Sequence, residues 1–467
     1  MSFKVFSIFL SWTIMVVPLF ASGAQQPIPS NRFSIEILSK RDNKWREVLV
    51  YQSTNPNNKE NDVSWCSFPA EGSLNVRIKS LQEEVNTVII RPGKFQIPHQ
   101  LLRGTLNVTF DKPHKLSIEI NGDQHHPLLL FAYSPEKIPK TKHGETLVIF
   151  KSGVQEIGER YPLKSNTIYY LEEGAYLRGS LYGKGALENV TIKGQGIIDS
   201  RDQKWQHPTK GLLSNIAFED GRNITIEGIT CLEAGNFQLK IQSKAENTRI
   251  TIKDVKLIGW NNNTDGIHVS DMDWKDNVKI GNAANTRLLV DDSFIRANDD
   301  AVLLCDGVSK SEMKNCVIWD NGYGASFCIS WGGHNKVESC LVKNCYVIHK
   351  EAKNPVFRAL HAGEAQIRNI RFENITIEGD AYTLVGLKIT HHKYDPDAGL
   401  GSIRNILFKN VSLEGITTDN YIEGFDSGHQ IENITFDNLN INGKPILNAS
   451  DMNLRTNEFV QDVRFVK

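Results

Sequence analysis

The chain has 467 residues, enough for two or three ordinary domains or for one elongated repeat domain with an addition. Hydrophobic residues make up 40% of it and charged residues 23%, which is typical of a soluble globular protein. The formal net charge of -1 leaves no basic excess for nucleic acid or an anionic membrane surface, so neither is an expected partner.

Residues 1–24 have the pattern of a secretory signal peptide. Lys4 precedes a mostly apolar stretch from Val5 to Phe20, and small residues at 21–24 offer a cleavage site. A membrane anchor is the alternative, but the stretch is short for a span and no basic stop-transfer cluster comes after it. We therefore predict secretion, to the extracellular space or the periplasm, without membrane insertion once the signal is removed.

Residues 25–140 alternate between apolar and polar side chains, as antiparallel strands do. Examples are Phe33 to Ile37, Leu74 to Ile78 and Leu106 to Phe110, with turn signals such as Asn121-Gly122-Asp123 between strands. This pattern predicts a small N-terminal β-sandwich. A segment with two prolines, residues 134–140, is the expected linker to the second domain.

From about Gly144 the pattern changes to a loose internal repeat. A polar turn leads into a β-branched strand, as in Asn189-Val190-Thr191-Ile192 and Asn223-Ile224-Thr225-Ile226, and copies recur to the end of the chain. Stacked repeats of this kind bury together an apolar face that one rung cannot bury alone. The predicted fold is all-β, with a right-handed parallel β-helix over residues 141–467 preceded by the sandwich.

An asparagine recurs in the turns of this repeat. Asparagine tolerates left-handed backbone conformations and can hydrogen-bond its counterparts along a stack. Several copies also form Asn-x-Ser/Thr glycosylation patterns, but the repeat itself demands this sequence, so we favour the structural explanation. These copies are Asn189, Asn223, Asn374, Asn410 and Asn433.

Five of the seven cysteines lie between Cys305 and Cys345, where short strands are expected. Their spacings match no zinc pattern. We expect buried thiols stacked on successive rungs, with a disulfide such as Cys316–Cys340 as the alternative. An odd count leaves at least one thiol unpaired in either case. No metal or other cofactor is predicted.

Three aspartates fall in two neighbouring rungs: Asp265 in Asn263-Thr264-Asp265-Gly266, and Asp299 with Asp300 in Asn298-Asp299-Asp300. Paired strands lie about 4.8 Å apart, so these carboxyls can be neighbours, and repulsion between them should raise at least one pKa. Inverting hydrolysis of a glycosidic bond needs one protonated carboxyl and one carboxylate that activates water. Because Asp299 and Asp300 are consecutive, both can serve one site only where the backbone bends.

The order of these motifs, followed by Val317-Ile318-Trp319-Asp320-Asn321 and Ile329-Ser330-Trp331-Gly332, resembles glycoside hydrolase family 49, the dextranase and isopullulanase group. It is more distantly similar to the family 28 polygalacturonases. Residues 116–136 extend the similarity to the end of the predicted sandwich. The resemblance implies an inverting hydrolase that cleaves internal α-glucosidic linkages of a dextran- or pullulan-like glucan. It implies Asp299 as general acid, and Asp265 with Asp300 as the pair that activates water.

Two departures from the family pattern bear on the substrate. Residues 270–284, which include Trp274, look like an insertion between Asp265 and Asp299, and they leave endo or exo action open. The Arg-Ile-Lys that contacts uronate in family 28 is not found, and Leu387-Lys388-Ile389 is the nearest piece. A neutral glucan is therefore favoured over pectin.

Further candidates for substrate binding surround the aspartates in the sequence. Trp260 and Trp331 are predicted walls for stacking on sugar rings, although interior packing is an equal alternative for such aromatics. His268 and His334 could orient a carboxyl or bind a hydroxyl, with a structural role as the alternative. Lys388 is a further candidate for a contact with substrate.

Two rival functions use the same fold. A polysaccharide lyase needs an acidic sugar, usually calcium, and a Lys or Arg base, and no basic residue stands beside these aspartates in the sequence. A non-catalytic carbohydrate-binding protein would have no need of closely packed carboxyls. Fold alone does not separate the three, because function resides in the site.

Overall fold

The computed structural model describes residues 14–16 and 27–467, except 40–42, 57, 59, 204–212, 245, 271, 274–277, 280–285, 306, 321, 332, 352 and 392–398. Most of the predicted signal peptide lies outside the described residues. Its described part is β1 (Ile14–Val16), which pairs in parallel with β12 (Thr146–Phe150). Among the helices that the described ranges contain, none is long and apolar enough to cross a membrane.

The N-terminal part is a β-sandwich of two five-stranded sheets, in the orders β3-β2-β6-β9-β8 and β4-β5-β11-β10-β7. Pairing is antiparallel except between β5 and β11. The predicted alternation supplies the core between the sheets, with Ile35, Val76 and Val108 fully or almost fully buried. The strands are β2 (Phe33–Ser39), β3 (Lys44–Val48), β4 (Tyr51–Thr54), β5 (Asp62–Pro69), β6 (Leu74–Ser80), β7 (Val88–Arg91), β8 (His99–Leu102), β9 (Thr105–Phe110), β10 (Lys115–Ile120) and β11 (Leu128–Tyr133), and the 3-10 helix η1 is Gly93–Phe95.

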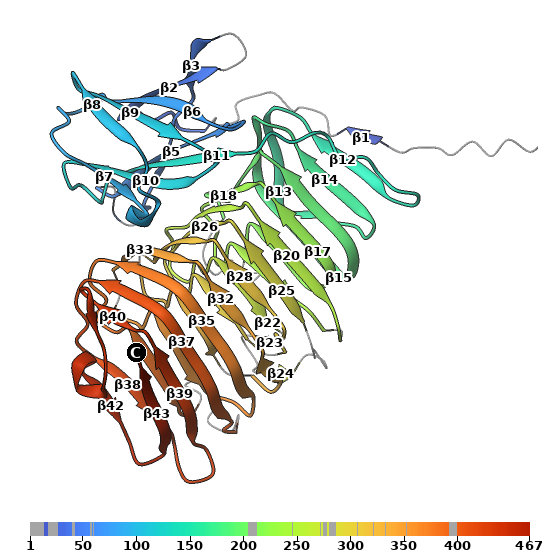
Figure 1. Cartoon of the computed structure of the whole chain (residues 1–467). Coiled ribbons are helices and arrows are strands. Elements are labelled where there is room, and N and C mark those ends of the chain that lie inside the picture. Colours follow the sequence, from blue (N-terminus) through green and yellow to red (C-terminus); the bar gives the residue numbers. More distant parts are fainter. Residues whose placement is uncertain are drawn as a thin grey trace, which may run out of the picture.

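The rest of the chain winds into a right-handed parallel β-helix, so the predicted fold class is confirmed (Figure 1). Its strands, together with β1, form one 31-stranded sheet in the described part of the chain. After β12 they are β13 (Gly153–Pro162), β14 (Thr167–Leu171), β15 (Ala175–Gly194), β16 (Ile197–Asp199), β17 (Ile216–Glu227), β18 (Thr230–Leu232), β19 (Leu239–Gln242), β20 (Arg249–Lys253), β21 (Lys256–Ile258), β22 (Ile267–Ser270), β25 (Arg287–Asp291), β26 (Phe294–Ala297), β27 (Val302–Leu304), β28 (Glu312–Lys314), β29 (Val317–Asp320), β30 (Phe327–Trp331), β31 (Val337–Glu338), β32 (Leu341–Lys343), β33 (Tyr346–Lys350), β34 (Phe357–His361), β35 (Gln366–Glu378), β36 (Val385–Ile389), β37 (Ser402–Glu414), β38 (Asn420–Glu423), β39 (Ile431–Asp437), β40 (Asn440–Ile441), β41 (Lys444–Pro445), β42 (Leu454–Thr456) and β43 (Val460–Val466), and the 3-10 helix η2 is Ala449–Met452.

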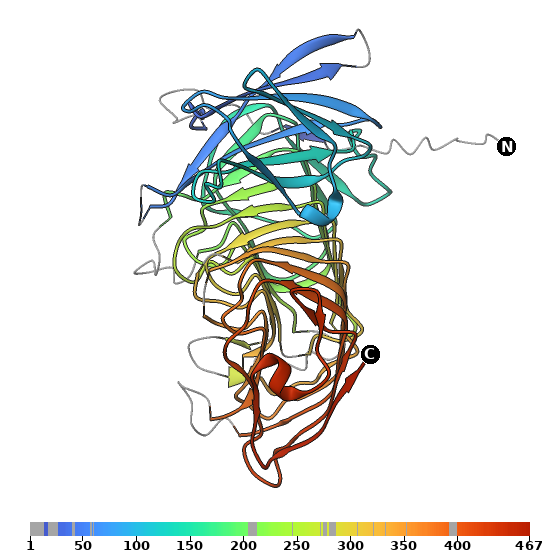
Figure 2. The same ribbon diagram turned by 60° about the vertical axis from the view of Figure 1, so that its left-hand side comes forward.

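Each rung near the aspartates contributes three strands to three parallel columns. Figure 2 shows the successive rungs stacked along the molecule. The first column contains β20, β25 and β28, the second β21, β26 and β29, and the third β22, β27 and β30. The turn from the second to the third column is the segment that holds Asp265 on one rung and Asp299 and Asp300 on the next.

Aliphatic and aromatic side chains fill the helix from end to end. Phe372, Phe408, Phe436 and Phe465 stack face to face, with neighbouring ring centroids 4.9–5.3 Å apart. All seven cysteines are buried and none forms a disulfide, which confirms the buried thiols predicted between Cys305 and Cys345 and excludes the Cys316–Cys340 disulfide.

The repeated asparagines have the predicted conformation and contacts. All five of those in Asn-x-Ser/Thr patterns have a φ between 52° and 57°. Each donates its Nδ2 to the Oδ1 of an asparagine on the preceding rung, as in Asn410 to Asn374 at 2.9 Å. Turn conformation and ladder contact together explain the recurrence of this residue.

The sandwich packs on the second column of the β-helix (Figure 1). Trp65 and Phe131 of the sandwich share one buried cluster with Phe294 of the helix. Arg91 on β7 pairs with Glu378 on β35 at 2.7 Å. Apolar and charged contacts therefore fix the sandwich to one face of the helix.

Candidate active site

The structure places the three predicted aspartates on adjacent rungs. Ile267 of β22 pairs with Val302 of β27, and the Gly266 N–H donates to the carbonyl of Asp300 at 3.0 Å. Asp265 and Asp300 are therefore equivalent positions of neighbouring rungs, as predicted. Residues 298–301 form a bent turn rather than a strand, so the backbone does not force Asp299 and Asp300 to opposite faces.

Asp265 is almost fully buried, and its Oδ2 lies 2.9 Å from Nδ1 of His268. The imidazole stacks on the ring of Phe237 with centroids 4.2 Å apart. Burial, and secondly the charge of Lys240, lowers the pKa of His268 to about 3. The imidazole is therefore neutral at ordinary pH and places its ring nitrogen where it can orient the carboxyl, one of its two predicted roles.

Asp299 is the most exposed of the three, although it is still partly buried. One of its oxygens accepts the Asp300 N–H at 2.9 Å, and the other lies 3.4 Å from Nδ2 of Asn263. Asp300 is more deeply buried, and its Oδ1 accepts the Ala325 N–H at 2.7 Å and lies 3.4 Å from the Arg358 guanidinium. Asp299 thus has the freer carboxyl, and Asp300 the more firmly held one.

Burial and mutual repulsion favour the protonated form of two of these carboxyls. The pKa of Asp299 is raised to about 7, first by burial and then by the charge of Asp300, while Arg358 opposes the rise. Burial, followed by the charges of Asp299 and Asp300, also raises the pKa of Asp265 well above its usual range. The cluster therefore holds protons at neutral pH, as a site that protonates a leaving group requires. Because both pKa values rise, electrostatics alone do not single out Asp299, and its greater exposure is what favours it as the donor.

A fully buried ion pair supports the turn beside Asp300. Lys350 Nζ lies 3.0 Å from Asp320 Oδ2 and donates to the Gly324 carbonyl at 3.1 Å. A Cβ on Gly324 would lie 2.0 Å from the carbonyl carbon of Asp299, so only glycine fits there. Lys350 thereby anchors Gly324. The next residue in the chain, Ala325, donates its N–H to Asp300.

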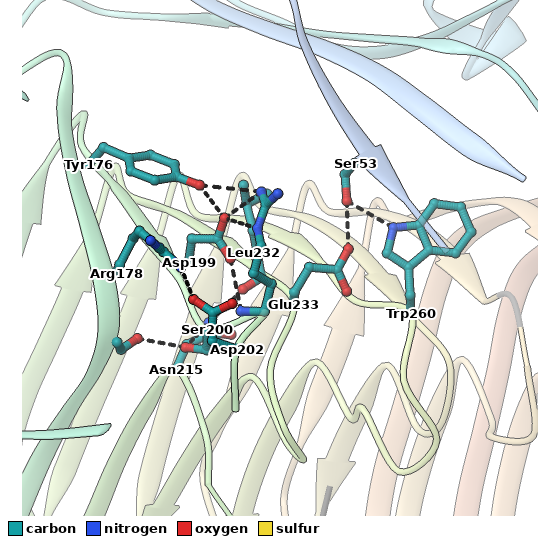
Figure 3. A network of polar contacts seen from close by, with 12 residues as sticks. Ser53, Tyr176, Arg178, Asp199, Ser200, Asp202, Asn215, Leu232, Glu233 and Trp260 are labelled. Carbon is teal, nitrogen blue, oxygen red and sulfur yellow. Dashed lines mark hydrogen bonds and ion pairs between the residues drawn. The ribbon is translucent and has the colours of Figure 1, made fainter. Parts of the chain in front are cut away.

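The structure corrects the prediction that Trp260 is a subsite wall. Its side chain is 2% exposed, and its Nε1 donates to Ser53 Oγ of the sandwich at 2.9 Å (Figure 3). The guanidinium of Arg296 covers its ring at 3.5 Å from the centroid. The ring and its polar tip are both engaged by protein groups, so the prediction for Trp260 is wrong. The indole packs between the two domains instead.

The other predicted binding residues are Trp331 at the end of β30, His334 shortly after that strand, and Lys388 on β36. Trp331 is half-buried, and the Arg358 guanidinium lies 4.8 Å from its ring centroid, which brings it beside the site. His334 is paired with Glu364 at 3.7 Å. Lys388 lies on the strand after that of Arg358 and pairs with Glu423 at 2.8 Å. The structure therefore brings Trp331 to the aspartates, while His334 and Lys388 are engaged elsewhere.

Sequence reasoning missed Arg358, whereas Tyr323 belongs to the aromatic residues that cluster around the aspartates in the sequence. Arg358 stands two strands beyond Leu303 in the third column, and a strand with one arginine among apolar residues was its only signal. Tyr323 is 68% exposed on the turn above Asn298, to whose carbonyl its N–H donates at 2.9 Å. An exposed aromatic ring beside the carboxyls is suited to stacking on a sugar.

The predicted insertion at 270–284 lies largely outside the described residues, and so does Trp274. Its described parts after Ser270 are β23 (Met272–Asp273) and β24 (Val278–Lys279), which pair antiparallel. Among the His, Cys, Asp and Glu side chains of the described ranges, no group of three or more is arranged to hold a metal ion.

Comparisons with known proteins agree with this architecture. The profile of glycosyl hydrolases family 28 matches residues 137–457. Dex49A from Penicillium minioluteum has the same fold over 96% of this chain and 97% of its own, with 15% identity and a TM-score of 0.72. A hyperthermoactive exopolygalacturonase from Thermotoga maritima is 16% identical, with 69% of this chain and 84% of that one covered and a TM-score of 0.47. No curated protein matches the chain significantly.

Proposed function

The chain belongs to glycosyl hydrolases family 28, and from that premise we propose that it is an inverting enzyme that cleaves internal α-glucosidic linkages of a neutral glucan such as dextran or pullulan. The observation that carries the proposal is the set of three carboxyls on two adjacent rungs, of which Asp299 is partly exposed with a pKa of about 7.

In the proposed reaction Asp299 donates its proton to the oxygen of the scissile bond. Asp300, held by Ala325 and Arg358, accepts a proton from the water that attacks the opposite face of the sugar. Asp265 accepts a second hydrogen bond from that water while His268 holds its other oxygen. Inversion results because the carboxylate activates water and does not attack the sugar itself.

Arg358, the cation that contacts the aspartates, is already paired with Asp300, which supports a neutral substrate. Lys388 pairs with Glu423 away from the site. The likeness of the aspartate motifs to the dextranase and isopullulanase group points the same way. A polygalacturonase is the second candidate, favoured by the family and by Arg358, whose guanidinium could bind a uronate carboxylate.

The experiment compares the wild type and Asp299→Asn on dextran, pullulan and polygalacturonate by the release of reducing ends. We expect activity on a glucan, reduced by about 10²–10⁴-fold in the variant because general acid catalysis is lost. NMR of the first products should show the inverted anomer. Activity confined to polygalacturonate would replace the glucan with pectin, and unsaturated products that absorb in the ultraviolet would indicate a lyase.

We also propose that the protein is secreted, on the strength of the pattern in residues 1–24. Expression of the full chain in its host, with separate assays of cells and medium, tests this proposal. N-terminal sequencing of the mature protein should give a start near residue 25. Retention of the whole N-terminus in the cell would contradict it.

A further inference from the structure

A hollow of about 440 Å³ lies on the second column beyond the edge of the sandwich, away from the aspartates. Its floor is formed by the equivalent residues of three successive rungs, Thr376, Ser412 and Asn440. Thr376 pairs with Ser412, and Ser412 pairs with Asn440. Its rim is the ladder Asn344–Asn374–Asn410–Asn438, and Tyr346 and Lys94 close the end nearest the sandwich. We call this hollow the asparagine trough.

The floor position changes chemistry where the sandwich stops covering it. On earlier rungs the same position holds Phe294 and Val317, both buried against the sandwich. The next residue in the series, Tyr346, packs edge-on against Phe95 of the sandwich with ring centroids 4.9 Å apart. After it come a threonine, a serine and an asparagine. The series is therefore apolar where it is covered and rich in hydroxyl and amide groups where it is open.

Charged side chains are scarce in the trough, unlike on the surface beside it. The residue just before each of the four rim asparagines is charged: Lys343, Glu373, Lys409 and Asp437. Among the described residues that line the trough, Lys94 alone carries a charge. On an ordinary solvated face, charged residues would continue across the turn. Here the charged residues stop at the asparagine ladder.

The rim amides keep hydrogen-bonding capacity for a ligand. Each ladder bond uses one N–H and one lone pair of an amide, and Asn374, Asn410 and Asn438 are exposed. A second N–H and a second lone pair per amide remain in addition. Donors and acceptors thus repeat once per rung, roughly every 4.8 Å, along the trough. A chain of pyranose rings offers hydroxyls at a similar repeat, and Tyr346 offers an aromatic wall.

We propose that the asparagine trough is a second, non-catalytic binding site for a neutral polysaccharide. The inference rests on the proposed function for the identity of the polymer, but its residues are separate from the catalytic ones. Occupancy of the trough would hold a long glucan on the enzyme between cleavage events. Short oligosaccharides, which do not reach both sites, would gain nothing from it.

The test uses Ser412→Arg, which places a long cation on the trough floor, with Asn440→Arg as a second variant in case the first folds poorly. Thr435→Arg, on the outer face of the first column, is the matched control. Each change is made in the Asp299→Asn background, and retention on dextran and pullulan is measured by affinity electrophoresis. We expect trough variants to bind polymer at least tenfold more weakly, and Thr435→Arg to bind like its parent.

A second measurement separates this inference from the proposed function. In the active enzyme, Ser412→Arg should lower activity on the polymer but leave activity on short oligosaccharides unchanged. Unchanged retention and polymer activity in both folded trough variants would overturn the trough while leaving the hydrolase intact. Retention lost in the trough variants from an enzyme that hydrolyses neither glucan would support the trough and remove the proposed function.

Discussion

Nδ1 of His268 lies 2.9 Å from Oδ2 of Asp265, and both side chains are almost fully buried. Because His268 is neutral, its nitrogen can accept the proton of Asp265 or donate to its carboxylate without adding charge to the cluster. His268 is therefore a positioning residue for Asp265.

His268→Phe should reduce kcat by roughly 10–100-fold while leaving KM little changed, because a small misplacement of a catalytic group is costly. The phenyl ring keeps the stack on Phe237, so the fold should survive. Circular dichroism and thermal melting provide the control. A folded variant with wild-type kcat would contradict the positioning role.

Arg358 should set the basic limb of the pH profile. Its guanidinium opposes the rise in the pKa of Asp299 and contacts Asp300. Arg358→Gln removes a cation, so the pKa of Asp299 rises further and the acid stays protonated to higher pH. The basic limb of kcat/KM should move up by about one pH unit, and kcat should fall. Arg455→Gln, at an exposed arginine farther along the third column, should leave the profile in place.

The buried pair of Lys350 and Asp320 should contribute to both stability and activity. Lys350→Met leaves the Asp320 carboxyl without its cation, at a cost of about 3–5 kcal/mol when it is ionised. Burial already raises the pKa of Asp320 to about 6. A raised pKa in the folded state means that stability is lost as pH rises, so the variant should lose more Tm at pH 8 than at pH 5. Lys350→Met combined with Asp320→Asn should recover much of the loss, and an equal Tm deficit at both pH values would refute this account.

The parts of the fold that depend on periodicity could be predicted from the sequence. Asn189-Val190-Thr191-Ile192 and its copies indicate a stack because each rung must present the same turn and the same apolar face. Equivalent turns also carried Asp265 and Asp300 to neighbouring positions. The spacing of two motifs along the chain was sufficient for this part of the site.

The contributions of a distant strand or of the other domain could not be predicted in the same way. Trp260 is near Asp265 in sequence, yet its indole faces the sandwich. There it donates a hydrogen bond to Ser53 and packs against the guanidinium of Arg296. Arg358 is remote in sequence, yet the register of β30 with β34 returns it to Asp300. For Trp260, proximity to the aspartates along the chain gave the wrong prediction. For Arg358 there was no such proximity to indicate a role. Both assignments needed the pairing of strands.

Tyr323 should contribute substrate binding through its ring rather than its hydroxyl. The side chain is 68% exposed on the turn next to Asp299, so its loss should not disturb the core. Tyr323→Ala should lower kcat/KM by roughly 5–10-fold, in line with an aromatic contact of about 1 kcal/mol, and Tyr323→Phe should retain most of the activity. An alanine variant as active as the wild type would remove Tyr323 from the site.

Glu233 should make the joint between the domains sensitive to pH. Its Oε1 accepts a hydrogen bond from the hydroxyl of Ser53 at 2.7 Å, and the same hydroxyl accepts a hydrogen bond from Nε1 of Trp260 (Figure 3). Burial raises the pKa of Glu233 to about 8, so the folded protein keeps a proton that the unfolded chain releases at about pH 4.3. The stability that this proton contributes is complete below about pH 4.3 and is lost as pH rises towards 8. In Glu233→Gln the amide cannot ionise, so Tm should fall less between pH 5 and pH 8 than in the wild type. The exposed Glu414→Gln should keep the wild-type slope, and parallel melting curves for Glu233→Gln and wild type would show that Glu233 does not titrate in the joint.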